Sequence, residues 1–383
     1  MNRDRLRRLG FALLAPVSAF AFAVLISSLA LWASGNDPFT AWREMLAYAN
    51  DTRRMISIVN RAIPLYISAL AVGFAFKMNL FNIGVEGQYQ LAALMAAAVG
   101  ASVDLPGPIH VLLILVVAMG VGAGWAGIAG VLKAYRGVHE VIATIMLNAI
   151  VTTGLLAYLL GNYLRDRSET QILKTHDLPA SGRMPSLNRP LAAIGIDVPQ
   201  GANLQGFLVI AILLGVAFYV VVSRTRFGYD LRASGVNPWA ALASGVHPKG
   251  MIVKTMLISG ALAGLVGMSQ LLGFFGRYHQ DFPTGLGFAG IAVALLGRNH
   301  PAGMAVSALL FGFLSTSAQI LDLRDIPKEI IDILQATVLL SVVVSYELVR
   351  RLVAASEVKA AAAATAGAAT QPAAAALSEE GDR

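Results

Sequence analysis

The chain has 383 residues, of which 56% are hydrophobic and only 13% are charged, and it contains no cysteine. Soluble domains carry about a quarter of charged residues, so a soluble protein with this composition could not cover its apolar surface. The composition therefore excludes a soluble enzyme, a disulfide-stabilised secreted domain and a disordered chain, and it indicates a polytopic membrane protein. The net charge of +7 needs its own explanation, because a basic chain can also bind nucleic acid.

Apolar runs recur along most of the chain, and about 20 apolar residues suffice for a helix to cross the hydrocarbon. The first run follows an arginine-rich start and is too long for the core of a signal peptide, so we expect a spanning helix whose N-terminus is cytoplasmic. A run of about 12 residues is too short to span alone and predicts a half-helix or a re-entrant element. Together the runs predict about ten crossings: Leu9–Ala33, Ile63–Met78, Gln88–Val103, His110–Leu132, Val141–Leu160, Gly206–Val222, Thr255–Phe275, the short Gly285–Leu296, Ala302–Leu321 and Ile330–Tyr346.

The distribution of basic residues supports this layout, in which both termini are cytoplasmic. On it, 17 of the 29 Lys and Arg lie on the cytoplasmic side, and most of the others lie in two longer outer segments. An excess of positive charge on short inner loops is the expected bias, so the basic charge mostly reflects topology and nucleic-acid binding is a remote alternative. We expect a transmembrane domain over 1–354, which includes a cytoplasmic loop over 224–254, and an Ala-rich disordered cytoplasmic tail over 355–383.

Some short strings match known catalytic motifs, but the residues around them do not fit the corresponding sites. The Gly-rich string Gly122–Gly127 matches a dinucleotide fingerprint, but it lies inside an apolar run without a preceding strand, so its glycines, with Gly260 and Gly264, more plausibly allow close helix packing. His139-Glu140 begins a zinc-protease pattern, yet Ala143 stands where the second ligand belongs. No phosphate-binding loop and no metal-ligand spacing occur in the sequence, so we expect no enzyme, no cofactor and no metal in this chain.

The first surviving feature is a polar, Gly-punctuated break between two apolar runs, Phe81–Gln88. Placing Asn82, Glu86 and Gln88 within the membrane costs free energy unless these side chains face protein or a water-filled path. Broken helices of this kind present polar groups to transported substrates. The alternative is that Glu86 pairs with Lys77 at the cytoplasmic interface and only orients the helix.

A second break, Gly285–Gly290, echoes the first in its glycine spacing and includes Phe288. Paired interruptions predict two related halves with a substrate path at their interface, whereas a tightly packed re-entrant helix without substrate contact is the alternative. Asn148 is a lone amide in an apolar run and is more often an interhelical hydrogen bond than a ligand contact.

The third feature is a short helix predicted within the cytoplasmic loop. Asn237 is a suitable N-cap, Pro238 suits the first helical position and Gly245 ends the helix. Such a helix suits docking in a groove of a partner, and a surface helix that lies along the membrane is the alternative.

With these residues the chain resembles permeases of the ATP-binding-cassette importers for branched-chain amino acids, simple sugars and nucleosides, and most closely the nucleoside type. The string Asn82–Gln88 is fairly specific for the nucleoside branch. The other matching segments are Glu140–Asn148, Arg232–Ala241 with Ser244–Val246, and Gly290–Arg298 with His300–Gly303. Of these, the motif in the cytoplasmic loop and the string Leu295–Gly303 mark the wider permease superfamily.

The resemblance implies a set of partners: a second, homologous permease, cytoplasmic ATPase subunits that bind the ATP, and an extracytoplasmic substrate-binding protein. It also implies that the helix 237–245 couples the permease to the ATPase, through Asn237, Pro238, Ala240, Ala241 and Gly245. We expect a bacterial inner-membrane importer subunit, with Asn82, Glu86, Gln88, Asn148 and Phe288 as candidates that line the substrate path or set its geometry. A simple-sugar or other small-solute permease, and less readily an ion-coupled secondary transporter, are the alternatives.

Overall fold

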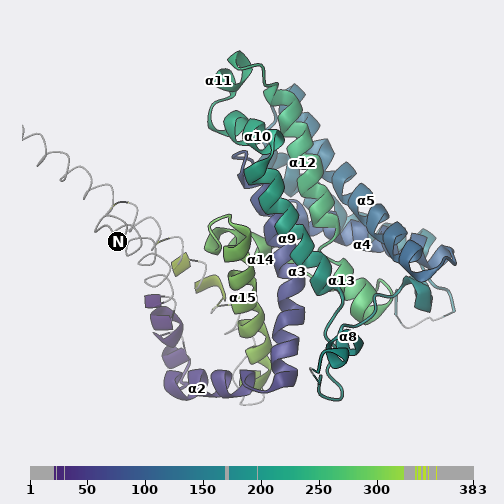
Figure 1. Cartoon of the computed structure of the whole chain (residues 1–383), viewed down its shortest axis with the longest axis vertical. Helices are drawn as coiled ribbons and strands as arrows, with labels where there is room; N and C mark the ends of the chain where they lie inside the picture. Colours follow the sequence, from purple (N-terminus) through teal and green to yellow (C-terminus); the bar gives the residue numbers. More distant parts are fainter. Residues whose placement is uncertain are drawn as a thin grey trace, which may run out of the picture. The chain divides into compact units, whose positions relative to one another are not determined.

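The structure is a bundle of α-helices, and within its described part the only strand pairing consists of two isolated bridges (Figure 1). It is a computed structural model that describes residues 21–322, except 23, 30, 169–171 and 196, together with 333, 335–337, 340, 341, 344 and 351. The chain divides into two compact units, Thr40–Lys328 and a second one formed by Met1–Phe39 with Glu329–Arg383. The features that position the candidate site all lie in Thr40–Lys328.

The longer helices are α2 (Pro38–Ala49), α3 (Thr52–Phe76), α4 (Val85–Ser102), α5 (Gly107–Arg136), α6 (Glu140–Ile150), α9 (Phe207–Arg224), α10 (Arg226–Val236), α12 (Pro248–Gly264), α14 (Leu286–Leu296) and α15 (Pro301–Asp322). Shorter helices are α7 (Leu156–Leu159), α8 (Asn188–Ala193), α11 (Pro238–Ala243) and α13 (Met268–Gln270). Three π-helical turns, η1 (Val151–Leu155), η2 (Leu160–Leu164) and η4 (Leu271–Phe275), and one 3₁₀ turn, η3 (Ala180–Gly182), complete the elements.

Eight of the predicted apolar runs correspond to helices or continuous helical stretches, from α3 to α15. Five stretches of the described chain are long and apolar enough to cross a membrane: Thr52–Phe76, Gly107–Arg136, Glu140–Leu164, Phe207–Arg224 and Pro248–Phe275. Most of the predicted spans Leu9–Ala33 and Ile330–Tyr346, and the whole tail 355–383, lie outside the described residues. The predicted all-α membrane bundle is therefore confirmed.

Helix α4 runs through the middle of the unit, which explains its polar composition. Of its 18 residues 13 are buried, and it contacts α3, α5, α6, α12 and α14. A helix enclosed by protein meets little lipid, so its polar side chains are free to face neighbouring helices.

Helices α5 and α12 pack closely at the glycines for which the sequence predicts this role. A Cβ atom on Gly122 would lie 2.2 Å from the carbonyl oxygen of Gly260, and one on Gly264 would lie 2.1 Å from that of Ala118. Small residues of this kind let two membrane helices approach closely. The packing fixes the two helices antiparallel, with the start of α12 beside the end of α5.

The predicted short element is confirmed as helix α14, and it forms a hairpin with α15. Eleven residues give α14 a length of roughly 16 Å, which is too short for a hydrocarbon layer about 30 Å thick. Both helices pack on α3: a Cβ on Gly290 would meet the Ser68 hydroxyl, and one on Gly312 would lie 2.6 Å from the carbonyl oxygen of Ile58. Helix α14 therefore cannot cross the hydrocarbon layer alone.

Candidate functional site

The first predicted break is a loop that turns back into the bundle between α3 and α4. Asn79, in the left-handed backbone conformation with φ +55°, donates a 2.7 Å hydrogen bond from its side chain to the carbonyl oxygen of Gly235 in α10. This bond ties the start of the loop to α10. The loop then runs into the bundle. There the Asn82 side chain lies beside Ser259, which is well inside α12.

Asn82 and Gln88 form a closed pair of side-chain amides. Each donates to the other over 2.9 Å, and Asn82 donates again to the Ser259 hydroxyl at 2.9 Å. Ser259 in turn donates to the carbonyl oxygen of Ala71 at 2.7 Å. Both amides are only 1% exposed, so this pair is held by the chain itself.

Glu86 joins the two breaks directly. Its carboxylate accepts hydrogen bonds from the backbone N–H groups of Gly285 at 2.7 Å and Gly287 at 2.8 Å, and from the Gln90 side chain at 2.6 Å. The Tyr89 hydroxyl lies 2.9 Å from the Oε1 atom of the same carboxylate. Glu86 is 3% exposed. We call Asn82, Glu86 and Gln88, with Gly285 and Gly287, the break junction.

The charge of Glu86 is balanced by helix ends. None of the ion pairs within the described part of the chain involves Glu86, including none with Lys77. Instead the carboxylate lies in the first turn of α4 and accepts from the N-terminal backbone of α14. Each helix N-terminus carries a partial positive charge, so two of them stabilise one buried anion.

The glycines of the second break are required by this contact. Gly285 adopts φ +84°, a conformation that L side chains rarely take. A Cβ on Gly287 would lie 2.4 Å from the backbone nitrogen of Glu86. The glycine spacing in the sequence therefore reflects the close approach of one break to the other.

The break junction lies near the middle of the spans. Its neighbours Asn148 and Ser259 lie eight and eleven residues into α6 and α12, which at 1.5 Å per residue is about 12–16 Å from the starts of these helices. A hydrocarbon layer is about 30 Å thick. An ionisable side chain at such a depth is by default a functional-site hypothesis.

The remaining two candidates differ in their surroundings. Asn148 is 8% exposed, and its side-chain oxygen accepts a 2.5 Å hydrogen bond from the backbone N–H of Gly87, so it makes the interhelical bond that its sequence context favours. Phe288, in the first turn of α14, is 50% exposed. Of the five path candidates, four are thus buried among the chain's own groups and one presents a surface.

The predicted short helix in the loop is confirmed as α11, and its caps are those that the sequence indicates. The Asn237 side chain accepts from the backbone N–H groups of Trp239 at 3.0 Å and Ala240 at 3.1 Å, and Gly245 adopts φ +82°. Pro238 is the first residue of the helix, and of the five predicted coupling residues only Ala241 is buried.

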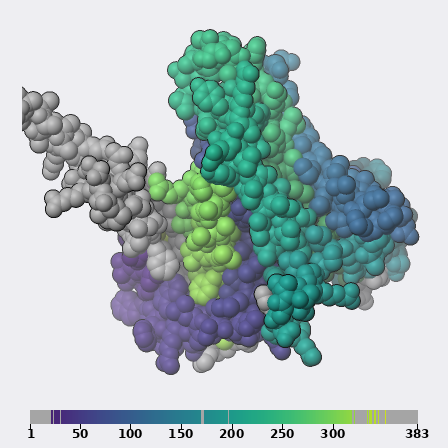
Figure 2. All heavy atoms as spheres, viewed as in Figure 1, coloured from purple at the N-terminus to yellow at the C-terminus, as the bar shows by residue number. Residues whose placement is uncertain are grey.

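Helices α10 and α11 project from one end of the unit, and α8 lies at the other (Figures 1 and 2). Apolar side chains are strongly exposed on this projection: Val236 is 83% and Trp239 is 81% exposed. Neither residue was predicted from the sequence, although an apolar residue beside a strong N-cap in a short polar loop is a usable signal. Exposed aromatic residues of this kind mark interaction surfaces.

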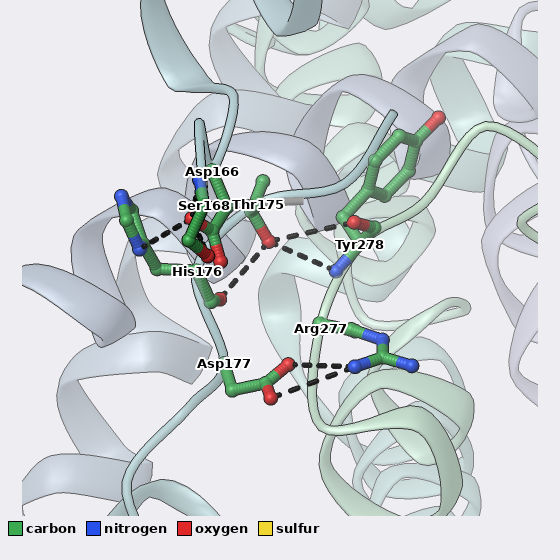
Figure 3. A network of polar contacts seen from close by, with 7 residues as sticks. All are labelled: Asp166, Ser168, Thr175, His176, Asp177, Arg277 and Tyr278. Carbon is green, nitrogen blue, oxygen red and sulfur yellow. Dashed lines mark hydrogen bonds and ion pairs between the residues drawn. The ribbon is translucent and has the colours of Figure 1, made fainter. Parts of the chain in front are cut away.

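At the α8 end, the segment between η2 and α9 is fastened to the loop after η4 (Figure 3). The backbone N–H of Thr175 donates to the carbonyl oxygen of Tyr278 at 2.9 Å, and Arg277 pairs with Asp177 at 3.1 Å. Asp166 accepts from the side chain and the backbone of Ser168, and these bonds hold the pKa of its carboxyl below the usual range. The described residues of 165–206, which belong to one of the two segments predicted to lie outside (the outer segment), are therefore tied to this end of the unit.

No cluster of three His, Cys, Asp or Glu suited to a metal ion occurs in the described part of the chain. A groove of about 440 Å³ in that part of the chain is lined almost entirely by apolar side chains of α3, α9 and α15. This groove is therefore not a polar site.

Comparison with known proteins decides the family. Residues 54–343 match the family described as branched-chain amino acid transport system, permease component. The chain belongs to this permease family. No solved structure matches the chain.

Three relatives among curated proteins cover most of this permease. The guanosine ABC transporter permease protein NupP of Bacillus subtilis (strain 168) is 35% identical, over 87% of this chain and 94% of its own. The glucose ABC transporter permease protein TsgB13 of Haloferax volcanii is 32% identical, over 86% and 87%. The nucleoside ABC transporter permease protein NupB of Lactococcus lactis subsp. cremoris is 30% identical, over 91% and 95%.

Proposed function

We propose that this permease, together with a second, homologous permease, forms the path by which an ATP-binding-cassette importer takes up nucleosides. The observation that carries the proposal is the string Asn82–Gln88, which forms the break junction here and which is characteristic of the nucleoside-type permeases that the chain resembles. Two relatives named for guanosine and nucleoside transport, at 35% and 30% identity, support it.

The break junction gives the path its geometry. The four buried candidates bind one another and glycine backbone; they are Asn82, Glu86, Gln88 and Asn148. These hydrogen bonds fix the N-terminal ends of α4 and α14. Phe288, exposed on the first turn of α14, is the member of this group that lines the path. Nucleosides are uncharged and carry a planar base, so an aromatic contact beside satisfied polar groups suits them.

Partner subunits supply the energy and the substrate. Helix α11 seats on a cytoplasmic ATPase, which binds ATP, and its movement rocks the helices between outward-open and inward-open states. The exposed Trp239 and the capped, rigid form of α11 support this coupling role. An extracytoplasmic binding protein docks on the outer segment at the α8 end. On this layout the permease lies in the inner membrane of a bacterium, with both termini cytoplasmic.

A simple sugar is the second candidate substrate, because a relative named for glucose transport is 32% identical over most of both chains. The ion-coupled secondary transporter is disfavoured by the surroundings of Glu86. A proton relay needs a carboxylate that opens to water, whereas Glu86 is 3% exposed and held by the backbone of the opposite break.

A ligand screen on the cognate binding protein tests the substrate. Nucleosides are expected to raise its Tm, and by mass action a ligand at 100 times its Kd adds about 2.7 kcal/mol of stability. Nucleobases, sugars and amino acids serve as controls. Stabilisation by sugars or amino acids alone contradicts the nucleoside proposal and leaves the importer assignment intact.

A further inference from the structure

The span Glu140–Leu164, formed by α6, η1, α7 and η2, changes character halfway along its exposed side. In the first half the exposed large side chains are aliphatic or thioether, such as Ile142, Met146 and Ile150. In the second half the exposed residues are small, hydroxylated, amide-bearing or aromatic. Those used below are Thr152, Thr153, Gly154, Tyr158, Asn162 and Tyr163, which we call the polar face.

Helix α9 provides the contrast. Its exposed large side chains are almost all aliphatic, and those outside the apolar groove, among them Val209, Leu213 and Val220, are as expected of a helix that faces lipid. Thr152, by contrast, stands twelve residues from either end of its span, about 18 Å along the helix and thus near mid-depth. A helix side with hydroxyl groups at that depth faces a water-filled space or another protein rather than lipid tails.

The backbone of this span is unusual at the same place. The π-helical turns η1 and η2 cover Val151–Leu155 and Leu160–Leu164. π-turns are rare and occur frequently at functional sites. A Cβ on Gly154 would meet nothing within 4 Å, so this helix side is open.

The hydroxyl groups have acceptor capacity to spare. Thr152 donates to the carbonyl oxygen of Asn148 at 3.0 Å, and Thr153 donates to that of Ala149 at 2.7 Å. Each hydroxyl oxygen keeps acceptor lone pairs that these donated bonds do not use. Tyr158 and Tyr163 add two exposed rings whose centroids are 5.7 Å apart.

The polar face is continuous with the break junction. Asn148, which accepts from the backbone of Gly87, lies one helical turn before Thr152 and provides the carbonyl oxygen that Thr152 binds. No Asp, Glu, Lys or Arg occurs in 151–164. The face therefore offers acceptors and aromatic rings but no charge.

We propose that the polar face is the wall of the solute path between the break junction and the α8 end, and that it contacts uncharged, hydroxyl-bearing solutes. A ribose or other polyol donates its hydroxyl protons to the Thr152 and Thr153 oxygens, and a planar base packs on Tyr158 and Tyr163. Anionic forms such as phosphorylated nucleosides find no counter-charge there. This inference rests on the proposed transport function and assigns the surface that the solute meets.

Because the chain has no cysteine, single cysteines report water access directly. The variant is Thr153→Cys, and the matched control is Leu213→Cys on the exposed side of α9, a residue that does not line the apolar groove. Each is produced in the complete importer in membranes and treated with a negatively charged, membrane-impermeant methanethiosulfonate. Since a charged reagent does not enter hydrocarbon, we expect at least about tenfold faster labelling of Thr153→Cys than of Leu213→Cys.

Guanosine delivered by the binding protein is expected to slow the labelling of Thr153→Cys. If Thr153→Cys is labelled no faster than Leu213→Cys, the face packs against lipid or the second permease and the inference is wrong. Fast labelling that glucose slows and guanosine does not keeps the path assignment and overturns the nucleoside proposal instead. Fast labelling that neither solute slows contradicts solute contact.

A second variant keeps the shape of the side chain. Thr153→Val removes one hydroxyl at nearly constant volume, and loss of one hydrogen bond to the solute raises the KM for uptake about three- to tenfold with kcat unchanged. An unchanged KM contradicts the hydrogen bond to Thr153. A lowered kcat with unchanged KM indicates a structural role and also contradicts the inference.

Discussion

Replacing Glu86 with glutamine is expected to reduce uptake by at least about tenfold and to lower the Tm of the permease in detergent by roughly 5–10 °C. The carboxylate accepts from Gly285 and Gly287, and a glutamine amide turns its NH₂ group toward one of these two N–H donors. Each buried group left without a partner costs about 1–3 kcal/mol. The substitution also removes the anion that faces the N-termini of α4 and α14.

Two further variants serve as controls for the Glu86→Gln result. Asp177→Asn makes the same carboxylate-to-amide change in an exposed ion pair, where a pair is worth about 0–1 kcal/mol, so it is expected to leave the Tm within about 2 °C. Glu86→Asp keeps the charge on a shorter side chain and is expected to retain part of the uptake. If Glu86→Gln keeps the Tm and the uptake of the unmodified protein, the break junction does not depend on its charge.

Removing the exposed indole on α11 is expected to separate transport from stability. Trp239→Ala should reduce ATP-driven uptake by at least about tenfold, because truncating an interface aromatic that acts as a hot spot costs about 2–4 kcal/mol. The Tm should change little, since Trp239 is 81% exposed and packs on little of its own chain. Uptake and ATP hydrolysis are measured in proteoliposomes that contain the complete importer.

Phe39→Ala on α2 is the matched control, because Phe39 is 77% exposed and has no assigned role. It is expected to leave uptake unchanged. Gly245→Val provides a second probe of the same surface, since a β-branched residue at φ +82° is strained by about 1–2 kcal/mol. Full uptake by Trp239→Ala would show that α11 is not the coupling helix.

Local chemistry made the helices and the short coupling-type helix predictable. Apolar runs located most spans to within a turn or two, and α11 follows from the residue types at Asn237, Pro238 and Gly245, which act within one turn of chain. The start of α3 was missed by about ten residues. Arginines interrupt the apolar run before Ile63, whereas the helix itself begins at Thr52.

The partners of Glu86 show what sequence alone left undecided. The nearest cation along the chain, Lys77, is the partner that local reasoning offers, yet the carboxylate bonds to backbone groups about 200 residues away. Such contacts depend on how α4 and α14 pack, and backbone N–H donors leave no mark in the residue pattern. The polar face was missed for a related reason: threonine and tyrosine in an apolar run say little until packing shows which side stays open.

The central claim is that this permease carries nucleosides inward at the expense of ATP. The most direct measurement is uptake of radiolabelled guanosine into proteoliposomes that contain this chain, its homologous permease and the ATPase, with the binding protein outside. The proposed function predicts uptake that requires ATP on the ATPase side and the binding protein, and that persists when the proton gradient is dissipated. Uptake that continues without ATP but collapses with the proton gradient would contradict it.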